Sequence, residues 1–79
     1  MRLKDTINQI MDFAKAHNDD VQVAHAKMVH MVVAEGFEGM TLYDLNKAKS
    51  FIDSHYDIVV EARQTGDYTA LDEALSVWE

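Results

Sequence analysis

The sequence contains no cysteine and no proline, and its only glycines are Gly36, Gly39 and Gly66. Without cysteine, neither disulfides nor thiolate metal sites can support a small core. Without proline, and with glycine confined to two places, few residues interrupt a helix. We therefore expect long helices separated by two joints, one near residues 36–39 and one at Gly66.

Basic residues are also scarce. Seven Lys and Arg stand against 14 Asp and Glu, for a net charge of −7. Residues 1–34 carry four residues of each sign, whereas residues 35–79 carry three basic and ten acidic residues, so the whole excess lies in the second part. Affinity for phosphates comes from Lys and Arg, so the composition disfavours direct nucleic-acid binding. The partner we expect is another protein with a basic surface.

Long apolar runs are missing. The first residues, MRLKDTINQIMDF, form neither a secretory leader nor a membrane span. The chain has 79 residues, of which 48% are hydrophobic and 27% charged, which is the composition of a folded globular chain. We expect one soluble, cytoplasmic helical domain over residues 1–79.

Apolar periodicity predicts a first helix over residues 3–17, with its end at His17-Asn18 because Asn tolerates a left-handed cap. Asp19 or Asp20 is expected to cap a second helix over residues 21–34. The apolar residues of the first helix at helical spacing are Leu3, Ile7, Ile10, Met11 and Ala14, and the core face of the second collects Val21, Ala24, Met28, Met31 and Val32.

The second helix carries a surplus of apolar residues away from that core face, namely Val23, Ala26, Val29 and Val33. Two interpretations remain open. The helix is either central and covered by neighbours on more than one side, or it exposes a self-association surface that supports a homodimer. We favour the central helix, because apolar helices are usually interior.

Thr41 and Asp44 have the spacing of a capping box and predict a helix start at Thr41. The apolar phase continues across Ser54-His55, so we expect one long helix to about Gln64, whose apolar arc is widened by Phe51, His55, Ile58 and Ala62. Thr69 and Asp72 repeat the capping spacing and predict a last helix over residues 69–78, with Leu71, Ala74, Leu75 and Trp78 on its apolar face. The expected fold is all-α, a compact bundle of about four helices with the third longest.

The joint Gln64-Thr65-Gly66-Asp67-Tyr68, followed by Ala70, Leu71 and Ala74, resembles the helix-turn-helix joint of tetratricopeptide repeats. A repeat array needs about three stacked units to bury a core, and no second copy occurs in this chain. The resemblance therefore indicates a shared turn and not membership of that family.

Catalytic and metal-binding motifs are missing as well. GxSxG, GxGxxG and GxxxxGK do not occur. His25 and His30 are five residues apart and do not share a helix face, while His17 and His55 lie in other segments. We expect no catalytic residues, no cofactor and no metal, and hence no enzyme.

One charged pattern stands out. Asp53, Asp57 and Glu61 have i, i+4, i+8 spacing, which places three carboxylates in a row about 6 Å apart on a single helix. We expect no Lys or Arg at a neighbouring turn to neutralise the row. Its spacing is close to that of phosphates along a nucleic-acid strand, so it could act as a DNA mimic in a basic groove. The alternative is an ordinary solvated face.

These features favour a small acidic protein-binding module that inhibits or modulates a larger nucleic-acid-handling protein. In size, acidity and lack of chemistry it compares with phage-encoded viral inhibitors, including host-takeover and anti-CRISPR proteins. Besides the acidic row, we expect Phe37, Tyr43 and Trp78 to contact the partner. The alternative is a self-associating structural or scaffold component with no inhibitory role.

Overall fold

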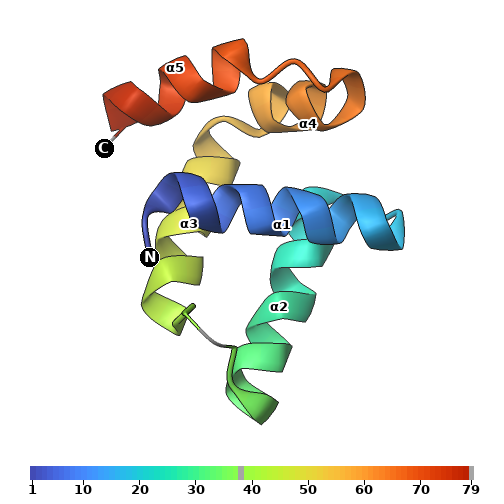
Figure 1. The fold of residues 1–79 in the computed structure, drawn as a ribbon, viewed down its shortest axis with the longest axis vertical. Coiled ribbons are helices and arrows are strands. Elements are labelled where there is room, and N and C mark those ends of the chain that lie inside the picture. Colours follow the sequence, from blue (N-terminus) through green and yellow to red (C-terminus); the bar gives the residue numbers. More distant parts are fainter. Residues whose placement is uncertain (38, 79) are drawn as a thin grey trace.

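The computed structural model describes residues 1–37 and 39–78. This part of the chain contains five helices, α1 (Leu3–His17), α2 (Val21–Glu35), α3 (Leu42–Ser54), α4 (Tyr56–Thr65) and α5 (Thr69–Trp78). In Figure 1, α1 runs across the middle of the molecule, α2 and α3 extend below it, and α4 and α5 form the opposite end. The all-helical expectation is confirmed, but this part of the chain forms five helices instead of about four, and the third, with 13 residues, is shorter than the first two, with 15 each.

The joint between α1 and α2 forms as predicted. Asn18 adopts the left-handed conformation at φ 54°, and its backbone N–H reaches the carbonyls of Ala14 and Lys15. The Asp20 carboxylate then accepts a hydrogen bond from the backbone N–H of Gln22 at 3.0 Å and caps α2. Both helix ends are therefore set by side chains and backbone within four residues of the joint.

The capping box at the start of α3 is also confirmed. The Thr41 hydroxyl accepts from the Asp44 backbone N–H, and the Asp44 carboxylate accepts from the Thr41 backbone N–H at 2.9 Å. The same carboxylate lies 3.6 Å from the α-amino group of Met1. These hydrogen bonds, the backbone one from Thr41 first, lower the pKa of Asp44 below its ordinary value.

The prediction of one long third helix is wrong, because the chain bends at His55, where φ is −129° and ψ is 35°. The His55 backbone N–H still bonds to the carbonyl of Phe51, and the His55 carbonyl receives the N–H of Val59. Apolar periodicity stays in phase on both sides of the bend, so the pattern alone could not reveal it. The bend turns α4 toward α5, with which it packs.

The joint between α4 and α5 is confirmed at Gly66, which is left-handed at φ 76°. The predicted capping residue is wrong. Thr69 is the first helical residue of α5, and its backbone N–H and hydroxyl both donate to the Asp67 carboxylate, at 3.1 and 2.8 Å. Asp72 instead lies 3.5 Å from the Lys4 ammonium on α1. The cap therefore begins two residues earlier than the spacing suggested.

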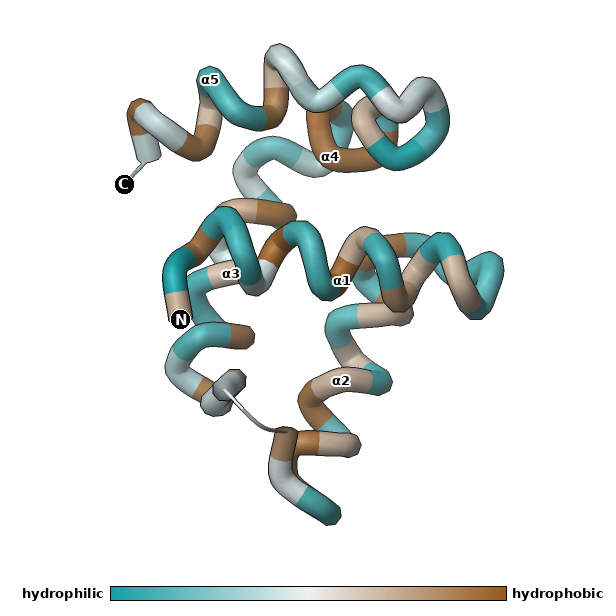
Figure 2. Tube along the Cα trace, viewed as in Figure 1, coloured by the Kyte–Doolittle hydropathy of each residue, from teal (hydrophilic) through white to brown (hydrophobic). Residues whose placement is uncertain are grey.

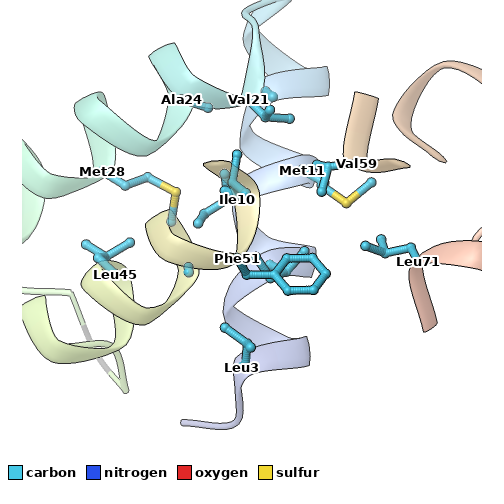
Figure 3. Packing of buried hydrophobic residues seen from close by; sticks show 14 of the residues in the cluster. Leu3, Ile10, Met11, Val21, Ala24, Met28, Leu45, Phe51, Val59 and Leu71 are labelled. Atoms are coloured by element: carbon cyan, nitrogen blue, oxygen red, sulfur yellow. The ribbon is translucent and has the colours of Figure 1, made fainter. Parts of the chain in front are cut away.

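One cluster of buried apolar side chains joins all five helices. Figure 3 shows Phe51 of α3 in the middle of this cluster, with Ile10 and Leu3 of α1 on two sides and Leu71 of α5 nearby. Hydrophilic and hydrophobic segments alternate along α1, as expected of a helix with one buried face (Figure 2). α1 packs against α2, α3 and α5, and α3 packs against α1, α2 and α4, so these two helices form the centre of the fold.

The interpretation of α2 as a central helix is consequently wrong. Val21, Ala24 and Met28 are buried, but Val33 is 69% exposed and Val23 45% exposed. α2 packs on α1 and α3 along one side only, so its opposite side stays open.

None of the helices in residues 1–37 and 39–78 combines the length and hydrophobicity needed to cross a bilayer. Over the same residues, no three His, Asp or Glu side chains gather closely enough to hold a metal ion.

Candidate protein-binding surface

Three adjoining hollows lie over the α3–α4 bend, α4 and α5, and Ile58 lines all of them. The largest has a volume of about 580 Å³ and is open to solvent. We call the combined area the α4–α5 surface, and its lining residues used below are Asp53, His55, Asp57, Ile58, Glu61, Asp67, Ala70, Glu73, Ala74, Val77 and Trp78.

The floor of this surface is apolar because α5 has apolar side chains on two faces, one buried in the core and one exposed to solvent. Leu71 and Leu75 point into the core and are buried. Ala70, one residue before Leu71, and Val77, two residues after Leu75, face the solvent. The Val77 side chain is 87% exposed. An apolar side chain that is so exposed contributes nothing to the core and gains free energy only when another surface covers it.

Trp78 is the aromatic residue of the α4–α5 surface, and its orientation is fixed. Its ring meets Phe51 edge-on at a centroid distance of 5.7 Å and His55 edge-on at 5.4 Å. The His55 ring in turn stacks on Phe51 at 4.5 Å. Trp78 nevertheless remains 43% exposed. A large ring that is held on one side and open on the other is a typical anchor for a binding partner.

Carboxylates surround the apolar floor. Asp57, Glu61 and Glu73 are exposed and form no ion pair with any other described residue. Asp67 is also acidic, and the hydrogen bonds from Thr69 lower its pKa below the ordinary value. The floor is thus framed by negative charge.

Arg63 is the only basic residue between positions 56 and 78, and it does not neutralise this surface. Its guanidinium is half-buried and donates from Nη2 to the carbonyl of Ala14, 3.3 Å away. That carbonyl belongs to the last turn of α1, where the helix dipole favours a positive charge. The cation therefore ties α4 to α1.

The predicted row of three carboxylates is only partly present. Asp53 lies on α3, whereas Asp57 and Glu61 lie on α4 beyond the bend, so the three do not share one helix. Asp53 and Asp57 still line the same hollow. The expectation that no basic residue neutralises the row is wrong for Asp53, because the Lys49 ammonium lies 2.9 Å from the Asp53 carboxylate at i, i+4 spacing.

Of the three predicted aromatic contacts, only Trp78 belongs to this surface. Phe37 is half-buried against the core, and Tyr43 is 69% exposed beside the Lys47 ammonium. Phe37 lies in the connection between α2 and α3, and Tyr43 in the first turn of α3; this connection is at the end of the molecule opposite α5 (Figure 1). The structure therefore separates Phe37 and Tyr43 from Trp78.

The self-association candidates on α2 differ in how far they are exposed to solvent. Val23, Ala26 and Val33 are exposed, whereas Val29 is half-buried and packs against the core.

Sequence reasoning missed Ala70, Glu73 and Val77. A signal was present, because together with Ala74 these residues have i, i+3, i+4, i+7 spacing, which marks a second face of α5 beside the buried one. Only the face formed by Leu71, Ala74, Leu75 and Trp78 was predicted from the sequence.

The chain matches no protein-family model, no curated protein and no solved structure closely enough to indicate a relative. The surface chemistry is therefore the basis for any functional argument.

Proposed function

We propose that this protein is a binding module that docks a positively charged protein on the α4–α5 surface. The observation that carries the proposal is the apolar floor with Trp78 and Val77, framed by the unpaired carboxylates of Asp57, Glu61 and Glu73. Burial of the floor supplies affinity, and the carboxylates select and orient a partner that carries Lys or Arg around an apolar contact.

The charge of the protein should also speed its association with a positively charged partner. The protein carries a net charge of −7, and the excess lies in residues 35–79, which include all of the α4–α5 surface. Such a field attracts basic proteins over a Debye length and raises the association rate, an effect that salt weakens. Neutral and acidic proteins gain no such attraction.

Within this class we propose a nucleic-acid-handling protein. Its basic groove is built to hold a row of phosphates, and Asp57 and Glu61, one turn apart on α4, supply negative charges in their place. Occupying the groove would block nucleic-acid entry, so the module would act as an inhibitor or modulator.

The experiment compares three immobilised proteins as baits in a cell lysate. They are the wild type, the surface variant Asp57→Asn/Glu61→Gln/Glu73→Gln, and a matched control with three neutralised carboxylates elsewhere, Asp5→Asn/Asp12→Asn/Glu35→Gln. All three control carboxylates are exposed, and both variants change the net charge by the same amount.

We expect a basic nucleic-acid-binding protein to be captured by the wild type and the control, and to be lost with the surface variant. Double-stranded DNA or RNA should compete with the module for the purified partner. Equal capture by both variants would contradict docking on the α4–α5 surface. Capture that nucleic acid does not compete would contradict the inhibitor role alone.

A further inference from the structure

The open side of α2 carries a stripe of residues separate from the α4–α5 surface. Val23, Ala26, His30 and Val33 are all exposed and have i, i+3, i+7, i+10 spacing. This is the spacing of the contact seam between two coiled-coil helices. Met28, which lies opposite the stripe, is buried in the core. The stripe is thus the middle of the face that α1 and α3 leave uncovered.

This face is electrically neutral in a strongly acidic protein. Between Val21 and Ala34 the only Lys, Arg, Asp or Glu is Lys27, and its ammonium lies 2.6 Å from the Asp19 carboxylate. Two copies of a protein with net charge −7 repel each other when their acidic faces meet. Val23, Ala26, His30 and Val33 include no carboxylate, so pairing two stripes adds no acidic side chain of the stripe to this repulsion.

The stripe is also symmetric about its centre. Val23 and Val33 are each five residues from Met28, and Ala26 and His30 are each two residues from it. If two α2 helices pack antiparallel about a two-fold axis at the level of Met28, Val23 of each copy therefore meets Val33 of the other. The small Ala26 likewise meets the larger His30, which fills the space that alanine leaves.

We propose that the open face of α2 binds a second copy of this chain, antiparallel about a two-fold axis that lies between the two helices at the level of Met28 along α2. The proposal is independent of the α4–α5 surface, which remains free on both copies. Its residues differ from the self-association set predicted from the sequence, because Val29 is half-buried against the core and His30 takes its place in the seam. A seam of three helical turns buries a small area, and interfaces below about 1,200 Å² are typical of weak, transient association. The dimer should therefore be populated at high protein concentration.

Cross-linking tests the arrangement directly, because the chain has no cysteine of its own. Chains with Ala26→Cys and chains with His30→Cys are mixed and oxidised, and the products are identified by mass. The antiparallel pairing predicts that the mixed Ala26→Cys/His30→Cys dimer dominates. Two Val23→Cys chains should cross-link poorly, because their cysteines would lie about 15 Å apart along the helix axis. Preferential cross-linking of two Val23→Cys chains indicates a parallel pair and overturns the proposal.

Sedimentation equilibrium up to about 1 mM tests the association itself. The variant Val23→Gln/Val33→Gln should raise the dimer Kd about tenfold or more, because each valine enters a two-fold interface twice. Val77→Gln on α5 is the matched control and should leave the Kd unchanged. Circular dichroism and the melting temperature establish that each variant is folded. A wild type that stays monomeric, or an equal effect of Val77→Gln, overturns the proposal.

Discussion

The phenol of Tyr56, the first residue of α4, donates a hydrogen bond to Oδ1 of Asp20, 2.5 Å away, and Oδ2 of the same carboxylate caps α2. One carboxylate thus joins the start of α2 to the bend after α3. This hydrogen bond raises the pKa of Tyr56 above its ordinary value of 10.0, because the carboxylate stabilises the protonated phenol.

Because Asp20 both caps α2 and accepts the hydrogen bond from Tyr56, replacing Asp20 should destabilise the protein more than replacing Tyr56. Asp20→Ala should lower the free energy of unfolding by about 1 kcal/mol through the lost cap alone. Tyr56→Phe should have the smaller effect, because α2 keeps its cap. Chemical denaturation of both variants and of the double variant measures the coupling. Strictly additive effects would show that the hydrogen bond contributes nothing.

The raised pKa of Tyr56 gives a prediction for alkaline pH. The pKa of Tyr56 is higher in the folded protein than in the unfolded chain. The hydrogen bond to Asp20 therefore contributes fully to the free energy of unfolding below pH 10, and this contribution is lost as the pH rises through the pKa of Tyr56 in the folded protein. An ultraviolet titration should resolve one of the three tyrosines at higher pH than the other two. Tyr56→Phe should remove that late transition.

Asp44 gives the opposite dependence at acid pH. The pKa of Asp44 in the folded protein lies below the ordinary value of 3.8. The ionised carboxylate therefore contributes fully to the free energy of unfolding above pH 3.8, and this contribution is lost as the pH falls through the pKa of Asp44 in the folded protein. Asp44→Ala should cost about 1 kcal/mol at neutral pH by opening the capping box. The difference in unfolding free energy between wild type and variant should narrow as the pH falls from 4 toward 2. A difference independent of pH would contradict this role.

Gly66 predicts a purely backbone effect. A Cβ at this position would meet nothing within 4 Å, but the residue is left-handed at φ 76°. Gly66→Ala should therefore destabilise the protein by about 1 kcal/mol without any steric clash, and Gly66→Asn should cost less because Asn tolerates this conformation. Melting temperatures of the two variants give the comparison. Equal destabilisation by both would contradict the conformational explanation.

The α4–α5 surface predicts a spectroscopic signal. Trp78 is the only tryptophan, so its fluorescence reports on this surface alone. A partner that covers Trp78 should shift its emission to shorter wavelength. Val77→Asp should weaken binding about tenfold or more while leaving the melting temperature unchanged, because Val77 is 87% exposed. Val33→Asp is the control on the opposite end of the molecule, measured below the concentration at which α2 associates.

The helix ends were the most predictable part of the fold. Asn18, the pair Thr41 and Asp44, and Gly66 were each predicted from the sequence and lie where expected. Caps depend on hydrogen bonds within about four residues and on backbone conformations that few residue types tolerate. A short stretch of sequence is therefore enough to predict them. The pairing of Lys49 with Asp53 was equally local and was overlooked.

The tertiary structure decided which apolar residues are covered. Periodicity says that a helix has an apolar face, but it cannot say whether a neighbour reaches that face, so α2 was placed in the centre although one side of it is open. The bend at His55 was invisible for the same reason, because the apolar phase suits one helix or two. The α4–α5 surface exists only because the bend brings α4 against α5, which places Ile58 beside Trp78. Such contacts join segments far apart in the chain, and the packing of the whole molecule selects them.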